Sequence, residues 1–293
     1  MDTHVGIIGY GEAGAAVAGG LAEEGATVMA LDTRLDGPAG PAMRAQAARD
    51  GVTLTGDMAD LAANCTLILS LVTSSAALGV AQSLAPHLGP AHLAADANST
   101  SPALAARVAA TLAEHGAQAV DVAVMAAVPP LRHHVPMLAS GPGSERLAAL
   151  GHGTNIEVVP GEPGAASAVK LLRSLLVKGL EALLVEFAVA SRHFGRTSEI
   201  LRSIDGTLPM DRFEDLATYL LGRTALHGER RGHELEEAAE MLRELDLEPL
   251  MAEAGGRRLL WAAAQGLPAR FADAPPAHYE EVIDALLEDG PRG

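Results

Sequence analysis

Cysteine, basic residues and uninterrupted apolar stretches are all scarce in this chain. Cys65 is the only cysteine among 293 residues, which excludes an internal disulfide and a zinc site built from thiolates. Its place just before the apolar run Leu67–Leu71 favours a buried side chain over a reactive thiol. The most apolar long stretch, 165–190, is interrupted by five charged residues and predicts a buried helix, not a membrane span. No targeting segment is visible, so we expect a cytoplasmic protein.

Acidic residues greatly outnumber basic ones. The chain has 37 Asp and Glu against 21 Lys and Arg, a formal net charge of −16. An acidic surface repels nucleic acid and anionic membranes, so we expect neither as a partner and expect a small-molecule substrate. With 48% apolar and 20% charged residues, the composition predicts a packed globular protein.

The order of apolar runs predicts the fold class. Short apolar runs alternate with helical stretches over the first 160 residues, which is typical of a mainly parallel sheet covered on both faces. After the turn at 161–164 only helical patterns follow. We therefore expect an α/β Rossmann domain over 1–162 and an all-α substrate and dimerisation domain over 163–293. The expected strands are 5–9, 27–32, 52–55, 66–72, 92–96, 118–124, 135–140 and 156–159; the expected helices are 11–24, 41–50, 74–84, 101–114, 143–150, 164–194, 197–204, 210–245, 249–266 and 276–289.

A glycine motif follows the first strand. Gly9, Gly11 and Gly14 form G-x-G-x-x-G between that strand and a helix, the pattern that binds a dinucleotide pyrophosphate at a helix N-terminus. The first glycine permits the turn, the second lets the backbone approach the phosphates, and the third lets helix and strand pack closely. The residues expected to contact the cofactor here are Gly9, Tyr10, Gly11, Glu12, Ala13 and Gly14.

Two charged residues after the second strand bear on the choice of cofactor. Asp32, eighteen positions after Gly14, is placed to accept hydrogen bonds from the adenosine ribose and to repel a 2′-phosphate. This favours NAD over NADP. Arg34 leaves the alternative open, because an arginine at that place can bind the phosphate of NADP.

Three further motifs carry a family resemblance. Gly164 and Lys170 form G-x₅-K at the start of the first helix after the expected Rossmann domain, and the segments 70–73 and 96–100 follow the fourth and fifth strands. With these motifs the chain resembles the β-hydroxyacid dehydrogenase superfamily, which includes 3-hydroxyisobutyrate and 6-phosphogluconate dehydrogenases. The resemblance implies that Lys170 is the catalytic acid/base. It implies further that the cofactor is lined by Leu71, Val72, Thr73 and Asn98, and that Ser99 lies at the substrate.

The chain departs from the family pattern at two places. Met125, Ala126 and Ala127 stand where the family usually has Ser-Gly-Gly, and Ser174 stands where it usually has asparagine. We expect the first three to shape the substrate pocket through backbone N–H groups and apolar contact, and Ser174 to hydrogen-bond the substrate. The C-terminal part is similar to a little-characterised branch labelled 6-phosphogluconate dehydrogenase-like with an NAD-binding C-terminal domain.

Lys170 has the chemistry that hydride transfer requires of the protein. Oxidising an alcohol needs a base for the hydroxyl proton, and reducing a carbonyl needs an acid. A free lysine, with a pKa of about 10.4, is a poor base at neutral pH, but burial beside Arg173 and Lys178 would lower that value. The alternative is a lysine that reaches solvent or pairs with a carboxylate. A helical wheel puts one polar stripe on this helix, made of Ser167, Lys170, Ser174, Lys178 and Glu181.

Two other polar groups are weaker candidates. His227 shares a helical face with Arg230 or Arg231 and with Glu234, which could reach an acid group of the substrate or could be a solvated face. The segment 132–134, Arg-His-His, is either a surface loop or a substrate contact. No metal motif is present, and we expect no metal site.

We therefore expect an NAD(P)-dependent dehydrogenase acting on the CH–OH group of a small hydroxy acid, or on the matching carbonyl acid. An imine reductase-like enzyme is one alternative, against which Lys170 argues. A dinucleotide-binding protein without catalysis is another. The apolar surface of the helix at 164–190 exceeds what one small helical domain can cover, so a homodimer is expected.

Overall fold

The computed structural model describes residues 4–193, 195–204, 212–244, 246 and 248–288. Its internal contacts divide the chain into two units, Met1–Lys170 and Leu171–Gly293. The expected boundary at residue 162 lies in the turn before helix α8 (Ala165–His193). The division falls later, because backbone N–H groups at the start of α8 are hydrogen-bonded to Asp121 of the first unit.

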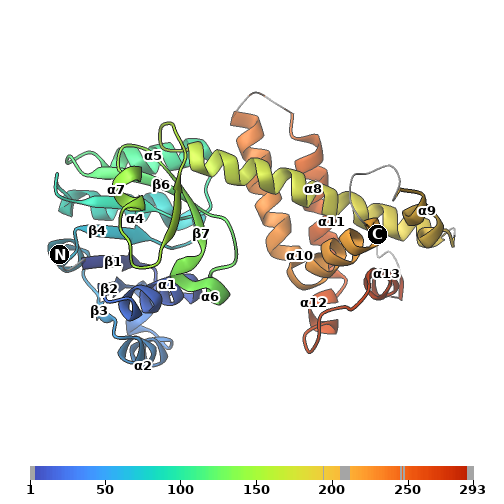
Figure 1. Cartoon of the computed structure of the whole chain (residues 1–293), viewed down its shortest axis with the longest axis horizontal. Helices are drawn as coiled ribbons and strands as arrows, with labels where there is room; N and C mark the ends of the chain where they lie inside the picture. Colours follow the sequence, from blue (N-terminus) through green and yellow to red (C-terminus); the bar gives the residue numbers. More distant parts are fainter. Residues whose placement is uncertain (1–3, 194, 205–211, 245, 247, 289–293) are drawn as a thin grey trace. The chain divides into compact units, whose positions relative to one another are not determined.

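The first unit is built on one eight-stranded sheet (Figure 1). The strand order is β3-β2-β1-β4-β5-β6-β7-β8, and every neighbouring pair is parallel except β6 and β7. All eight expected strands are present, and the predicted fold class is confirmed. The strands are β1 His4–Ile8, β2 Thr27–Leu31, β3 Thr53–Thr55, β4 Leu67–Ser70, β5 Leu93–Asp96, β6 Gln118–Val124, β7 Pro136–Ser140 and β8 Asn155–Val158.

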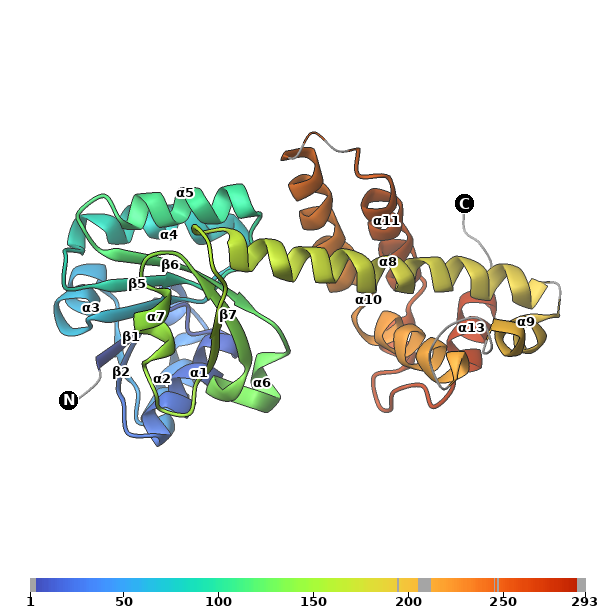
Figure 2. The ribbon, with the colours of Figure 1, turned by 45° about the horizontal axis from the view of Figure 1, so that its top comes forward.

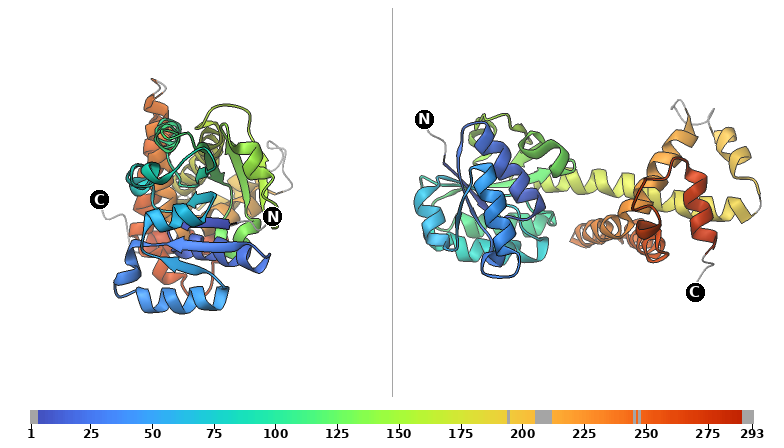
Figure 3. Two further views of the ribbon diagram at one scale, coloured as in Figure 1. Left: turned by 90° about the vertical axis from the view of Figure 1, so that its left-hand side faces the viewer. Right: turned by 90° about the horizontal axis from the view of Figure 1, so that it is seen from below.

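Helices cover both faces of this sheet (Figure 2). On one face Leu21 of α1 and Met43 of α2 pack on the apolar side chains of the strands, and these two helices lie in front of the sheet in the right-hand view of Figure 3. On the other face Leu61 of α3, Ala81 of α4 and Val108 of α5 form a second core. The helices are α1 Glu12–Glu23, α2 Gly40–Asp50, α3 Met58–Asn64, α4 Ala77–Leu84, α5 Pro102–Leu112, α6 Val128–Leu131 and α7 Ser144–Ala148, with the 3₁₀ turns η1 Thr33–Asp36, η2 Ser74–Ala76, η3 Ala85–His87 and η4 Arg132–His134.

The sequence did not predict the short helices α3, α6 and α12. They have 7, 4 and 4 residues, fewer than a hydrophobic repeat needs to show a helical period. Helix α3 begins after Asp57, whose carboxylate accepts a hydrogen bond from the Ala59 N–H at 2.8 Å. Capping chemistry, not amphipathicity, is therefore the local signal for this helix.

The described residues of the second unit form only helices. Its core gathers Leu201, Leu221, Tyr279 and Ile283 from three of them. Helix α10 is kinked at His227, where φ is −135° and ψ is 18°, next to Gly228. The helices are α8, α9 Thr197–Ile204, α10 Phe213–Glu244, α11 Leu250–Ala264, α12 Leu267–Arg270 and α13 Tyr279–Glu288.

Some predicted helix ends, at 194, 210–211, 245 and 289, lie outside the described residues. No helix in the described part of the chain is long and apolar enough to cross a membrane.

Candidate functional site

The glycine motif forms a tight turn between β1 and α1. Gly9 has a φ of +95°, in the left-handed region that favours glycine, and a Cβ at Gly14 would overlap the carbonyl oxygen of Gly9. A Cβ at Gly11 would meet Arg34 Nη2 at 3.4 Å and no other described side chain or distant backbone atom within 4 Å. The backbone at Gly11 thus has the room that a pyrophosphate at the N-terminus of α1 needs.

Asp32 ties this turn to the end of β2. Its buried carboxylate accepts hydrogen bonds from Tyr10 N at 2.9 Å, from Arg34 N and Nε at 2.9 Å each, and from Arg34 Nη2 at 2.7 Å. The bonds from Arg34 hold the pKa of Asp32 below its usual value. Arg34 therefore approaches the glycine turn with its charge paired to Asp32. From the sequence, the two residues pointed to alternative cofactors, Asp32 to NAD and Arg34 to NADP.

Tyr10 takes part in the turn through its backbone only. Its ring is buried in the core between α1 and the sheet, and burial raises the pKa of its hydroxyl to about 12. Glu12 is exposed at the first residue of α1, and Ala13 is half-buried beside it. Tyr10 can therefore meet a cofactor only through its main chain. The contacts predicted for residues 12 and 13 stay predictions.

The loops after β4 and β5 are joined by Asn98. Its Oδ1 accepts a hydrogen bond from Val72 N at 2.6 Å, and its Nδ2 donates to Ser70 Oγ at 3.1 Å and to Asp96 Oδ1. Asn98 is buried, so its side chain holds Leu71, Val72 and Thr73 in place. Asn98 therefore positions this loop, and its predicted contact with the cofactor stays a prediction.

Asp96 and Asp121 are two buried carboxylates at neighbouring strand ends. They are register partners across β5 and β6, with exposed fractions of 2% and 1%. Burial raises the pKa of Asp96 to about 7, and the Asp121 charge adds to the rise. Asp96 Oδ2 has no hydrogen-bond partner among the described residues. Asp96 opens the motif 96–100, but neither carboxylate was predicted as a site residue from the sequence.

Asp121 holds the start of α8. Its carboxylate accepts hydrogen bonds from Gly164 N at 2.9 Å, Ser167 N at 3.0 Å, Ser167 Oγ at 2.6 Å and Ser140 Oγ at 3.2 Å. A carboxylate at a helix N-terminus is stabilised by the exposed N–H groups and by the helix dipole. Gly164 has a φ of +110°, and a Cβ there would lie 2.7 Å from the Pro102 carbonyl oxygen, which explains why the motif begins with glycine.

Lys170 lies on the second turn of α8. Its ammonium donates a hydrogen bond to Ser99 Oγ, in the loop after β5. The carboxyl ends of β1, β4 and β5 are aligned in the sheet, since Ile8 pairs with Ser70 and Ser70 with Asp96. The structure therefore places Lys170 and Ser99 at the same end of the strands as the glycine turn.

The expected substrate loop is only partly available. The Met125 N–H donates to the Pro136 carbonyl at 2.8 Å, which continues the pairing of β6 with β7. That N–H is thus already paired within the sheet, and the role predicted for Met125 at the substrate stays a prediction for its side chain. Ala126 and Ala127 are exposed.

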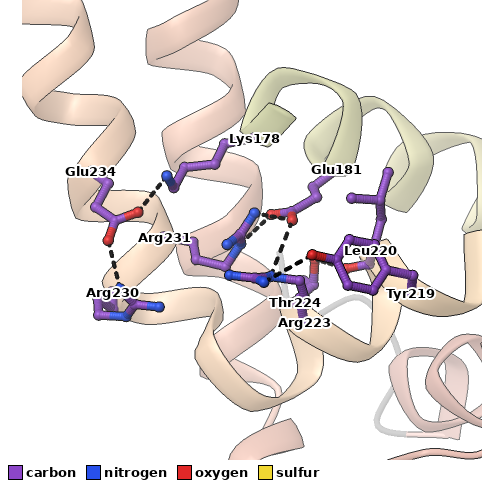
Figure 4. A network of polar contacts seen from close by, with 9 residues as sticks. All are labelled: Lys178, Glu181, Tyr219, Leu220, Arg223, Thr224, Arg230, Arg231 and Glu234. Atoms are coloured by element: carbon purple, nitrogen blue, oxygen red, sulfur yellow. Dashed lines mark hydrogen bonds and ion pairs between the residues drawn. The ribbon is translucent and has the colours of Figure 1, made fainter. Parts of the chain in front are cut away.

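The second unit contains a buried ion-pair network between α8 and α10 (Figure 4). Glu181 is fully buried and pairs with Arg231, with Arg223 Nε at 4.0 Å. Lys178 pairs with Glu234, which also accepts a hydrogen bond from Arg230 at 2.8 Å. Burial lowers the pKa values of Lys178 and Arg231.

This network accounts for most of the polar stripe and polar face noted in the sequence. Lys178 and Arg231 have carboxylate partners inside the unit, so neither is a free cation for a substrate. Ser174 is buried, and His227 is exposed at the kink of α10, where partial burial and Arg230 lower its pKa. The sequence placed these residues on shared helical faces, but it could not show which of them pair with each other.

Comparisons with known proteins place this geometry in a family. The chain matches the NAD binding domain of 6-phosphogluconate dehydrogenase over residues 4–145 and a domain of unknown function (DUF1932) over residues 192–261. A conserved hypothetical protein from Sinorhizobium meliloti is 36% identical, with a TM-score of 0.84 over 99% of this chain and 97% of that one. A conserved protein of unknown function, described as structurally similar to 3-hydroxyacid dehydrogenases, is 30% identical, with a TM-score of 0.77 over 98% and 99%.

The chain belongs to the β-hydroxyacid dehydrogenase superfamily. More distant members share its fold. The 3-hydroxyisobutyrate dehydrogenase of Mycobacterium tuberculosis, solved with L-serine, is 20% identical, with a TM-score of 0.71 over 98% of this chain and all of that one. A reductive aminase from Aspergillus terreus, solved with NADPH and ethyl levulinate, is 19% identical, with a TM-score of 0.53 over 97% and 99%. This β-hydroxyacid dehydrogenase relative thus has the dinucleotide-binding fold of an oxidoreductase family.

Proposed function

We propose that this superfamily member transfers a hydride between NAD and a small hydroxy acid, or the matching carbonyl acid, with Lys170 as general acid/base. The observation that carries the proposal is the contact between Lys170 Nζ and Ser99 Oγ at the edge of the sheet that carries the glycine turn. A proton-transfer group there lies where a nicotinamide bound to this fold meets its substrate.

The residues present suit a dinucleotide. Gly9–Gly14 and the N-terminus of α1 would hold the pyrophosphate, Asp32 the ribose, and the segment 71–73 the nicotinamide end. When bound, the cofactor supplies or accepts the hydride. Neutral Lys170 would take the proton of the substrate hydroxyl in oxidation, and its ammonium would return that proton in reduction.

The protein orders the lysine through a short chain of contacts. Asp121 fixes the first turn of α8 to β6 and β7, so the backbone of Lys170, one turn further, is held against the sheet. Ser99 Oγ then sets the direction of the ammonium. Both contacts lie within the first unit.

The choice of NAD rests on Asp32. Its carboxylate is an acceptor for the ribose hydroxyls and opposes a 2′-phosphate. Arg34 neutralises part of that charge, so we propose a preference for NAD and not an exclusion of NADP. An imine substrate remains the alternative that the reductive aminases represent. The lysine favours a substrate with a hydroxyl group, because a base is needed to remove the hydroxyl proton during oxidation.

A substrate screen tests the proposal. Purified protein is incubated with NAD or NADP and a panel of hydroxy acids, hydroxy amino acids, sugar acids and, in the reverse direction, keto acids and preformed imines, while absorbance of the reduced cofactor is followed. We expect turnover with a hydroxy or keto acid. Turnover confined to imines would favour the reductive aminase alternative, and cofactor binding without turnover of any compound would favour a non-catalytic protein. Ser174→Ala and His227→Ala, tested on the substrate found, should raise KM if these residues contact it.

A further inference from the structure

A group of metal-ligating side chains lies at the C-terminal end of α1, far from the catalytic lysine in the sequence. Glu24 directly follows α1, and His133 and His134 belong to the turn η4 between β6 and β7. One ligand atom from each of the three residues lies within 4.8 Å of the other two. From the sequence, the two histidines pointed only to a surface loop or a substrate contact, and no metal site was expected, because Glu24 lies far from them along the chain.

His133 is the unusual member of the group. Its side chain is only 3% exposed, and neither ring nitrogen has a hydrogen-bond partner among the described residues. The ring lies against Gly20 of α1, where a Cβ would overlap it, and 3.9 Å from the ring centroid of His134. Leaving a buried polar group unpaired is destabilising, so an imidazole in this position calls for a partner. A bound cation would supply one.

The local charge also favours a cation. The last turn of α1 carries the acidic Glu23 and no basic residue, and Glu24 follows it at the negative end of the helix dipole. Glu23 is paired with Arg132. Glu24 is exposed, and its backbone carbonyl, not its carboxylate, takes the His152 hydrogen bond at 3.0 Å. A positive ion beside Glu24 would offset both the carboxylate and the helix dipole.

We propose that Glu24, His133 and His134 bind a divalent first-row metal ion, with zinc as the best fit. Two imidazoles and one carboxylate are a common zinc ligand set, and a water completes four-coordination. Ligand atoms about 2.0–2.2 Å from one ion lie at most about 4.4 Å apart, so the three side chains can reach one ion with no more than a small movement. Magnesium and calcium, which prefer an all-oxygen shell, should bind far more weakly.

The role that follows is structural. The ion would fasten the C-terminal end of α1 to η4, while the glycine turn lies at the other end of this 12-residue helix, roughly 18 Å away. It would therefore stabilise the helix that presents the phosphate-binding turn without taking part in hydride transfer.

Zinc titration of the full chain, without a histidine tag and after treatment with a chelator, tests the proposal. We expect isothermal titration calorimetry to give one tight site, and saturating zinc to raise the thermal unfolding midpoint. Glu24→Gln and His134→Gln, two exposed positions, should each weaken binding about tenfold or more. Glu23→Gln is the matched carboxylate control, and His115→Gln, an exposed histidine elsewhere among the 11 in the chain, is the histidine control. Both should bind zinc like the wild type.

Three results would overturn the proposal: wild-type protein that binds no zinc, Glu24→Gln and His134→Gln variants that bind it as tightly as wild type, or equal weakening in the controls. His133→Asn adds a further arm where it folds. Because the readouts are binding and unfolding, failure here leaves the proposed dehydrogenase function untouched.

Discussion

Asp32 accepts four hydrogen bonds from two residues, Tyr10 and Arg34. The spacing from Gly14 to Asp32 predicted an acidic group at the adenosine ribose. It could not predict that Arg34, two residues on, donates to both carboxylate oxygens. A pair of this kind places an acceptor for the ribose hydroxyls and a cation for a 2′-phosphate at one site. The preference for NAD over NADP therefore depends on both residues.

Substitutions at this pair should move the cofactor preference in opposite directions. Asp32→Ala removes the ribose acceptor and frees Arg34, so the NAD-to-NADP affinity ratio should fall about tenfold or more. Arg34→Ala frees Asp32 and should raise that ratio. Titrations of both cofactors into wild type and variants measure it, with Arg44→Ala, an exposed arginine on α2, as control. Wild-type protein that binds NADP more tightly would contradict the assignment to NAD.

Asp96 should give the folded protein an unusual dependence on pH. Burial raises its pKa to about 7, so between the unfolded value near 4 and about pH 7 the native state holds a proton that the unfolded chain releases. The contribution of Asp96 to stability therefore falls as pH rises through this window and is level above it. The asparagine of Asp96→Asn does not titrate. The free energy of unfolding of this variant, relative to that of the wild type, should therefore be higher at pH 8 than at pH 5.

Chemical denaturation at the two pH values measures this difference. Asp36→Asn, at an exposed aspartate, is the control and should follow the wild type at both. An Asp96→Asn protein whose stability relative to wild type is the same at pH 5 and pH 8 would show that Asp96 is ionised in the native state throughout this range.

At the scale of elements, hydrophobic period and glycine placement predicted the sheet and the long helices. All eight strands appear, and α9 has the bounds predicted for it, Thr197–Ile204. The misses have physical causes. The helices α3, α6 and α12 are too short to show a period, and the Met125 N–H is taken up by β7 because strand pairing cannot be read from one segment alone.

Two distant contacts were out of reach of the sequence for the same reason. Asp121 with the start of α8, and Glu24 with His133, are brought together by the fold and not by spacing along the chain. The G-x₅-K motif pointed to the start of α8. Asp121, the carboxylate that holds it, lies 46 residues before Ser167, and no local pattern links the two.

Asp121→Asn tests whether this anchor positions Lys170. The amide keeps the shape but loses the charge and one acceptor, which should destabilise the protein by about 2–3 kcal/mol. At a temperature where the variant is folded, we expect kcat to fall with little change in cofactor affinity. Ser140→Ala is the matched milder variant, because it leaves the carboxylate in place and removes the longest of its four hydrogen bonds together with the bond from Ala166 N to Ser140 Oγ at 3.0 Å. Loss of stability with unchanged kcat would make Asp121 a purely structural residue.

At the scale of the whole molecule, α8 leaves a row of large apolar side chains in solvent. Leu172, Leu176, Leu180 and Leu183 are 42–67% exposed, and Leu250 and Met251 of α11 continue the apolar surface at 63% and 61%. Leu176, Leu180 and Leu183 line one groove with the α11 residues. The spacing of the leucines, three or four residues, is that of a helix face that packs on another helix. We propose that a second copy of the chain covers this face.

Light scattering should then report a homodimer at micromolar concentration. Leu176→Glu and Leu183→Glu place charges in the apolar face and should shift the protein toward monomer. Leu131→Glu, at an exposed leucine of α6 outside this face, should leave the mass unchanged. A monomeric wild type, or an effect of Leu131→Glu equal to the others, would contradict the proposal.

The central claim is that Lys170 carries the proton in hydride transfer, and Lys170→Met tests it most directly. The substitution keeps the aliphatic stem on α8 and removes the ammonium that contacts Ser99. The measurement is kcat on the substrate found in the screen, with NAD affinity measured on the same preparation. The account predicts a loss of about 10²–10⁴-fold in kcat with NAD affinity unchanged, because the glycine turn and Asp32 hold the dinucleotide. A variant that turns over within a few-fold of wild type would contradict it.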